Sequence, residues 1–316
     1  MSVTLAALGF LTCFYILAKV SEYFIQGLSS IARRYHIPQS VAGATLAAIG
    51  SSSPELFTNI AAVNLNVPNV GVGTITGSAI FNILVIVGLS ALAGRCRVMP
   101  RVVTRDGLTY LFALITLIVV IWDRKIMRWE AMALVVLYFF YFGILVRDIK
   151  KHPEQLPPDQ REKVMSQGWA CFSIVGGFLI FGVVCHYLIY FTLILGKAMH
   201  VDPVVMGLLA NAAGTSIPDT MASVAAARLG LGSLAISNAV GSNIFDIWFC
   251  IGAPLSPRHV TPVAGEVFAS VPFLLASFAV ALFFIRSGWE VTRREGIVLL
   301  VLYGLYFGYT LYQGLN

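Results

Sequence analysis

Two short stretches place an acid directly behind a proline in the middle of apolar sequence. Residues 50–55 read GSSSPE and residues 214–219 read GTSIPD, so Glu55 and Asp219 each follow a proline and hydroxyl side chains. Carboxylates, hydroxyls and backbone carbonyls are hard oxygen ligands, which suit calcium, sodium or potassium better than zinc or copper. The two stretches therefore predict a site for inorganic cations.

Each proline is also expected to break a helix and release a backbone acceptor. Proline has no N–H, and its ring clashes with the carbonyl four residues earlier, so Pro54 frees the carbonyl of Gly50 and Pro218 frees that of Gly214. At membrane depth such a group is tolerated only where protein, water or an ion satisfies it. An ionisable residue inside a membrane is a functional candidate by default.

A second polar pair follows each break, with a spacing of four residues that places both members on one helix face. Ser78 precedes Asn82 in the first case, and Ser242 precedes Asp246 in the second. A single serine in such a helix is more often structural, so the duplicated acids carry the prediction. The candidate cation ligands are Ala48, Ser51, Ser52, Glu55, Ser78, Asn82, Ala212, Thr215, Ser216, Asp219, Ser242 and Asp246.

The composition predicts that these residues lie in helices that cross a membrane. Hydrophobic residues make up 58% of the 316 residues and charged residues only 11%, against about 25% charged in soluble domains. Ten apolar stretches are long enough to span a bilayer. We expect an all-α integral membrane protein with transmembrane helices at about 5–26, 39–64, 70–93, 107–122, 129–146, 169–194, 203–227, 234–254, 264–285 and 294–312.

The hydrophilic segment 147–168 divides the chain into a first five-helix half, 1–146, and a second, 169–316. With these spans, the loops on the side of this linker hold 15 lysines and arginines, and the loops on the other side hold 5. The positive-inside rule then places the linker in the cytoplasm and both termini outside, in a plasma or cell membrane. The net charge of +6 reflects this topology and does not indicate a nucleic-acid partner.

The two halves are related in sequence. At an offset of 164 residues, 43–62 aligns with 207–226 and 70–83 aligns with 234–247, with 12 identities in 34 positions. Chance in this composition gives about 2 or 3. Five spans separate equivalent points, and an odd number inverts the second copy relative to the first. The sequence predicts two inverted repeats, with broken second and seventh helices at the core. The glycines of GVGTITGS (71–78) are expected to allow close helix packing.

The motifs GSSSPELF, GVGTITGSAIFNILVIVG, GTSIPDTMAS and GSNIFDI resemble the two alpha repeats of the calcium/cation antiporter superfamily, the sodium/calcium exchangers. They are most similar to the potassium-dependent branch. The resemblance implies alternating access, with calcium and sodium bound by Glu55 and Asp219 and by the neighbouring hydroxyls. Asp246 stands where the potassium-dependent branch carries Asp, although some microbial relatives carry Asp there without needing potassium. The chain departs from the family pattern at Leu209 and Asn211 and in its short linker.

The resulting prediction is a sodium-driven calcium antiporter that also transports potassium with calcium, binds no cofactor and is not an enzyme. Its partners are the transported cations and the lipid bilayer, and the sequence does not indicate an oligomeric state. Potassium-independent sodium/calcium exchange and calcium/proton exchange are alternatives on the same scaffold. A cation channel is another alternative. An intramembrane aspartyl protease, with Glu55 and Asp219 as its acid dyad, is a more remote one.

Overall fold

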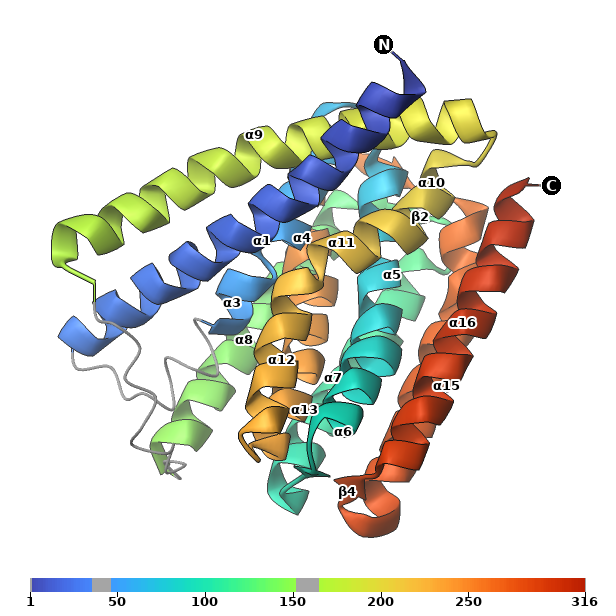
Figure 1. Ribbon diagram of the computed structural model, residues 1–316. Coiled ribbons are helices and arrows are strands. Elements are labelled where there is room, and N and C mark those ends of the chain that lie inside the picture. Colours follow the sequence, from blue (N-terminus) through green and yellow to red (C-terminus); the bar gives the residue numbers. More distant parts are fainter. Residues whose placement is uncertain (1, 36–46, 152–164, 316) are drawn as a thin grey trace.

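The computed structural model describes residues 2–35, 47–151 and 165–315, and nearly all of them are helical (Figure 1). The first half contains α1 (Val3–Arg34), α3 (Ala47–Ser51), α4 (Ser53–Asn64), α5 (Pro68–Phe81), the π-helix η2 (Asn82–Ile86), α6 (Val87–Ala93), β1 (Cys96–Arg97), α7 (Pro100–Ile121), β2 (Lys125–Met127) and α8 (Arg128–Lys151). The second half contains α9 (Gln167–Met199), α10 (Pro203–Met206), η3 (Gly207–Asn211), α11 (Ala212–Thr215), α12 (Ile217–Arg228), α13 (Gly232–Phe245), η4 (Asp246–Cys250), α14 (Ile251–Leu255), β3 (Val260–Pro262), α15 (Gly265–Gly288), β4 (Glu290–Val291) and α16 (Arg293–Leu315).

The predicted membrane-spanning helices are confirmed. Within the described residues, eight helical segments are long and apolar enough to cross a bilayer. The other two predicted spans are interrupted and correspond to α3–α4 and to α10–α12, and residues 39–46 of the first of these lie outside the described residues.

Two of the eight long segments form the centre of the bundle. The buried share of Pro68–Ala93 is 83% and that of Gly232–Leu255 is 72%, whereas it lies between 22% and 44% in the remaining six. The outer helices expose large apolar side chains, among them Leu11, Phe140 and Leu305. An exposed apolar surface of this extent is what a lipid-facing helix requires. The two central segments carry the predicted polar pairs.

The second half is inverted relative to the first. In Figure 1, α1 runs from upper right to lower left, and α9 packs against it and runs back in the opposite direction. Two short antiparallel β-ribbons also link the two halves. β1 of the first half pairs with β4 of the second, and β2 of the first half pairs with β3 of the second. Each ribbon joins one strand from each half, and Figure 1 shows β2 and β4 toward opposite ends of the molecule. The ribbons are an addition to the predicted all-α fold.

Both predicted helix breaks are present. Ser52 separates α3 from α4, and Ser216 separates α11 from α12, each directly ahead of a first turn that contains the proline. The backbone angles at the two serines agree closely, with φ −91° and ψ 8° at Ser52 and φ −82° and ψ 7° at Ser216. Proline is favoured in the first helical turn, where its missing N–H costs nothing. Each proline therefore ends one helix and starts the next.

Close packing of the two halves depends on glycine at one crossing. Gly77 in α5 faces the Leu208 backbone in η3, and a Cβ atom at this position would overlap the Leu208 carbonyl. Gly207 on the other side of the crossing approaches the Val70 carbonyl in the same way. The glycines of residues 71–78 thus serve helix packing, as the sequence predicts.

We expect Gly77→Ala to destabilise the protein by about 1–3 kcal/mol, because the added methyl group must push α5 away from η3. Gly143→Ala is the matched control, since nothing lies within 4 Å of a Cβ at Gly143 in α8. The measurement is the thermal unfolding midpoint of the purified protein in detergent. A midpoint for Gly77→Ala equal to that of Gly143→Ala would contradict the packing role.

Candidate cation site

The two helix breaks meet at the interface of the repeats through a reciprocal pair of hydrogen bonds. The Ser52 hydroxyl of the first half donates to Asp219 Oδ2 at 3.4 Å, and the Ser216 hydroxyl of the second half donates to Glu55 Oε1 at 3.1 Å. All four side chains are buried. Each acid therefore receives a hydroxyl from the other half, and neither half forms this arrangement alone.

The helix termini favour negative charge at this place. Glu55 lies in the first turn of α4, and Asp219 lies in the first turn of α12. The N-terminal N–H groups of a helix present partial positive charge, which stabilises a carboxylate there. The breaks bring two such termini into the core of the protein, far from the ends of the spans. This is the local reason why two acids can be buried side by side.

The carboxylate of Asp219 is well supplied with donors. The Ser242 hydroxyl donates to its Oδ1 at 3.0 Å, and the Asn238 amide reaches the same oxygen at 3.4 Å. Ser51 is also close enough to interact with it. The carboxylate of Glu55 has fewer hydrogen bonds than that of Asp219. Thr215 and Ser216 lie against it, but its Oε2 has no hydrogen-bond partner.

Asp246 and Asn82 occupy equivalent places at the start of two π-helical turns. Asn82 begins η2 and Asp246 begins η4, so the widened turn recurs at the same point of each repeat. Both side chains are fully buried. No hydrogen bond of normal geometry reaches either oxygen of Asp246 or the Oδ1 of Asn82, although Cys250 and Ser52 lie close to Asp246. Buried polar atoms are rarely left without a partner, and π-turns are often found at functional sites. These oxygens are therefore candidate ligands for a cation.

The orientation of the Asn82 amide is fixed by Asn243. The Asn243 Nδ2 donates to the Ala79 carbonyl and to the Tyr110 hydroxyl, both at 2.9 Å. A carbonyl accepts only, so Asn243 must turn its own Oδ1 the other way, where it receives Asn82 Nδ2 at 2.9 Å. Asn82 is thereby left with its Oδ1 as the free end. A neutral amide is thus set to present an oxygen, as a cation ligand must.

The remaining predicted ligands lie around the same breaks. Ser78 donates across the repeats to the Ala212 carbonyl at 3.4 Å, and Thr215 donates to the Asn211 carbonyl at 3.0 Å. Ala212 also accepts from the Ser216 backbone N–H, so its carbonyl is shared and not bare. Ala48 lies in α3, just ahead of the first break.

The acids are distributed and do not form one chelate. Among the described residues, no three acidic, histidine or cysteine side chains are grouped as ligands of a single metal ion. Asp246 nevertheless interacts electrostatically with both Glu55 and Asp219. The arrangement suits neighbouring cation positions in which each acid is supplemented by hydroxyl, amide and carbonyl oxygens.

Sequence reasoning missed Asn238 and Asn243. Both lie on α13, whose apolar pattern gives no reason to single out an asparagine. Asn238 also donates to Ser223 at 3.0 Å, and its partners Asp219 and Ser223 both belong to α12. The only available signal was their position on the same helix as Ser242 and Asp246.

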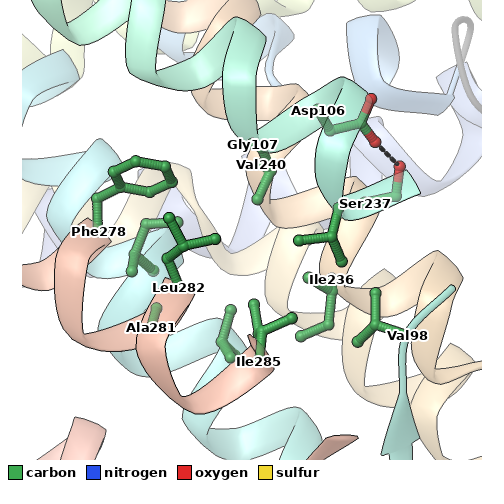
Figure 2. A pocket seen from close by; sticks show the side chains of 13 residues that line it. Val98, Asp106, Gly107, Ile236, Ser237, Val240, Phe278, Ala281, Leu282 and Ile285 are labelled. Atoms are coloured by element: carbon green, nitrogen blue, oxygen red, sulfur yellow. Dashed lines mark hydrogen bonds between the residues drawn. The ribbon is translucent and has the colours of Figure 1, made fainter. Parts of the chain in front are cut away.

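An apolar cavity elsewhere in the bundle has a different character. Figure 2 shows it between α7, α13 and α15, lined mainly by aliphatic side chains and Phe278, with Asp106 at its margin. Asp106 accepts from Ser237 at 2.7 Å and from Arg105 at 2.6 Å. Arg105 in turn contacts Asp148 at 2.9 Å. This acid is fully paired, in contrast to Asp246.

Sequence similarity shows the family of this chain. A sequence model of the family described as sodium/calcium exchanger protein matches residues 5–147 and 169–312. The chain therefore belongs to the sodium/calcium exchanger family. This is a family of transporters, so the protein is not an enzyme and the protease alternative is excluded.

This chain resembles several named exchangers, three of them over more than 90% of its own length. It is 28% identical to the sodium/calcium exchanger MaX1 of Methanosarcina acetivorans, covering 91% of this chain and 93% of that one. It is 25% identical to the human sodium/potassium/calcium exchanger 4, covering 98% and 81%. A 147-residue stretch is 43% identical to the human sodium/potassium/calcium exchanger 3, covering 46% of this chain and 23% of that protein. A structure of the sodium-calcium exchanger NCX_Mj soaked with Na⁺ and Sr²⁺ aligns with a TM-score of 0.68 and 26% identity, covering 97% and 99%.

We expect Asp246→Asn to raise the unfolding midpoint in buffer free of sodium, potassium and calcium, since it removes a buried charge that has no partner. Asp106→Asn makes the same chemical change at a paired acid, and we expect it to lower the midpoint, by about 0.5–3 kcal/mol in free energy of unfolding. Both are measured by thermal unfolding in detergent. A lower midpoint for both variants would show that Asp246 is already stabilised by groups of the protein.

Proposed function

We propose that this protein is an antiporter that exchanges sodium for calcium by alternating access. The observation that carries the proposal is the reciprocal contact of Ser52 with Asp219 and of Ser216 with Glu55, which places two buried acids at the interface of two inverted repeats. Secondary transporters of this plan bind their ions where broken helices meet near the membrane midplane. Family membership and the likeness to NCX_Mj, a sodium-calcium exchanger, support the proposal.

The ligands in this proposal are the twelve residues predicted from the sequence. Every side chain among them that carries a polar group offers oxygen, and the unpartnered atoms Glu55 Oε2, Asn82 Oδ1 and both oxygens of Asp246 are acceptors. Bound cations would complete their coordination. Sodium and calcium would compete for the same oxygens, and such competition couples the movement of one ion to the opposite movement of the other.

Potassium co-transport with calcium is the finer part of the proposal. Glu55, Asp219 and Asp246 together carry three negative charges when ionised. Three sodium ions neutralise this charge, whereas a calcium ion leaves one charge that a potassium ion would balance. The unpartnered Asp246 supports a separate place for that second ion. The similarity to the human sodium/potassium/calcium exchangers 3 and 4 points the same way.

The proposed orientation follows the charge asymmetry of the loops. The predicted linker 147–168, of which residues 152–164 lie outside the described residues, would face the cytoplasm, and both termini would face outward across a plasma or cell membrane. The segments 1–146 and 169–316 act as the two repeats. Calcium/proton exchange is the nearest alternative on this scaffold, and pH-driven calcium uptake without sodium would favour it. A steady conductance that is not coupled to a counter-ion would favour a channel.

Glu55→Gln and Asp219→Asn should each reduce sodium-driven calcium uptake to background, because each removes a charged ligand from the core of the site. Uptake is measured in proteoliposomes loaded with sodium and diluted into sodium-free buffer containing calcium. Glu22→Gln is the matched control, since Glu22 is an exposed acid in α1 paired with Lys19 at 3.3 Å. Sodium-driven calcium uptake that persists in both Glu55→Gln and Asp219→Asn would contradict the assignment of these acids as ligands.

Calcium uptake should require external potassium, and Asp246→Asn should lose that requirement because the third negative charge is gone. The same vesicles are assayed with potassium or with choline outside. If calcium uptake by the unaltered protein depends on internal sodium but is the same with potassium or choline outside, the protein exchanges sodium for calcium without potassium. Proton-driven uptake without sodium would instead contradict sodium/calcium exchange.

A further inference from the structure

A groove runs between α4 and α14 on one side of the candidate cation site. Its volume is about 470 Å³, and it is lined by Ile60, Val63, Asn64, Asn66, Ala253, Pro254, Pro257 and Arg258. One wall is α4, which carries Glu55 in its first turn, and the other is α14, which follows the π-turn that begins at Asp246. The groove therefore leads away from two of the three acids toward the end of the molecule where α4 ends.

Asn59 lies on α4 directly before the groove-lining Ile60. Its Nδ2 donates to the Cys250 carbonyl at 2.7 Å, and both residues are fully buried. This contact joins α4 to the end of η4 between Glu55 and the groove-lining Ile60 and Val63. This contact therefore lies between the groove and Glu55 along α4, and the groove is a candidate outer vestibule of the site.

Arg258 places a positive charge at the mouth of this vestibule. Its guanidinium donates to the Val63 carbonyl and to Asn66 Oδ1, each at 2.7 Å. Both acceptors are neutral, and within the described part of the chain no carboxylate pairs with Arg258. The charge is therefore not compensated locally, and the guanidinium holds two oxygens that a free cation would otherwise be able to use.

At the opposite end of the molecule the equivalent helix end is covered without an arginine side chain, although Arg95 and Arg293 line a cavity nearby. At the internal offset of 164 residues, Gly94 corresponds to Arg258 and Ala227 corresponds to Val63. There the Gly94 backbone packs directly against the Ala227 carbonyl, so closely that a Cβ atom would overlap it. The same helix end is covered by backbone on one side and by a guanidinium on the other. A capping role alone does not account for the difference.

We propose that Arg258 is an electrostatic barrier that weakens the entry of cations from the α4–α14 vestibule and leaves entry from the opposite face unaffected. The inference rests on the proposed exchange function and assigns a residue that sets the apparent affinity at one face. Repulsion between point charges is proportional to the charge of the approaching ion. Removing the barrier should therefore change the affinity for a divalent ion by the square of the factor for a monovalent ion.

The test compares Arg258→Gln and Arg258→Lys with Lys125→Gln, which removes a positive charge from β2 at the same end of the molecule. Calcium and sodium dependence of exchange are measured in right-side-out and inside-out membrane vesicles. At one face only, we expect Arg258→Gln to lower the KM on the order of threefold for sodium and tenfold for calcium. Arg258→Lys keeps the charge and should keep the original KM, as should Lys125→Gln.

Ionic strength supplies a readout that a structural role of Arg258 would not affect. The difference between Arg258→Gln and the unaltered protein should shrink when choline chloride is raised from 0.1 M toward 1 M, because the screening length falls from about 10 Å to about 3 Å. An unchanged KM, equal changes at both faces, or a change in Arg258→Lys equal to that in Arg258→Gln would overturn the proposal.

Failure of the proposed exchange would be recognised separately. If the unaltered protein shows no sodium-dependent calcium flux, the exchange function is wrong. The barrier is then decided by the rate at which radioactive calcium associates with detergent-purified protein at low ionic strength. Faster association with Arg258→Gln supports the barrier, and an equal rate contradicts it.

Discussion

The burial of three carboxylates in an apolar bundle is the constraint on which the rest of this structure depends. Taking an ionised acid out of water costs several kcal/mol even after relaxation, unless hydrogen bonds and opposite charges replace the solvent. An unbroken helix offers little help, because all its interior N–H groups are already bonded. Breaking two helices at Pro54 and Pro218 brings N-terminal turns and serine hydroxyls to the acids. The carboxylates that remain without partners are those that a cation would complete.

Inversion of the repeats turns two modest clusters into one site. Asp219 receives donors from its own half, Ser242 and Asn238, but each acid also receives a serine hydroxyl that only the other half can supply. The two β-ribbons at the ends of the molecule also join the halves, because each contains one strand from either half. Contact at Gly77 allows the halves to approach closely enough for these bonds. The tight interface is thus a condition for burying the charges.

Much of the fold can be predicted from sequence because bilayer thickness fixes span length and proline fixes the breaks. The spacing of Ser78 from Asn82 likewise places both on one face of a helix. The π-turns at Asn82 and Asp246 were not predicted, since one extra residue per turn leaves an apolar segment apolar. The hydrogen bonds of Asn243 could not be predicted because its partners lie on α5 and α7, more than a hundred residues away in the chain. The strands are two or three residues long, too short to show alternation.

Departures from the internal symmetry matter as much as the symmetry. Two identical halves would give an even number of acids and chemically equivalent faces, so an ion would meet the same site from either side. Replacing an amide by an acid between Asn82 and Asp246 makes the number of carboxylates odd. Gly94 stands where the second half has Arg258, so the two equivalent helix ends are covered in different ways. In the proposed mechanism the repeated fold fixes where cations are held, and the divergent residues Asp246 and Arg258 set how much positive charge is needed and how readily it enters from one side.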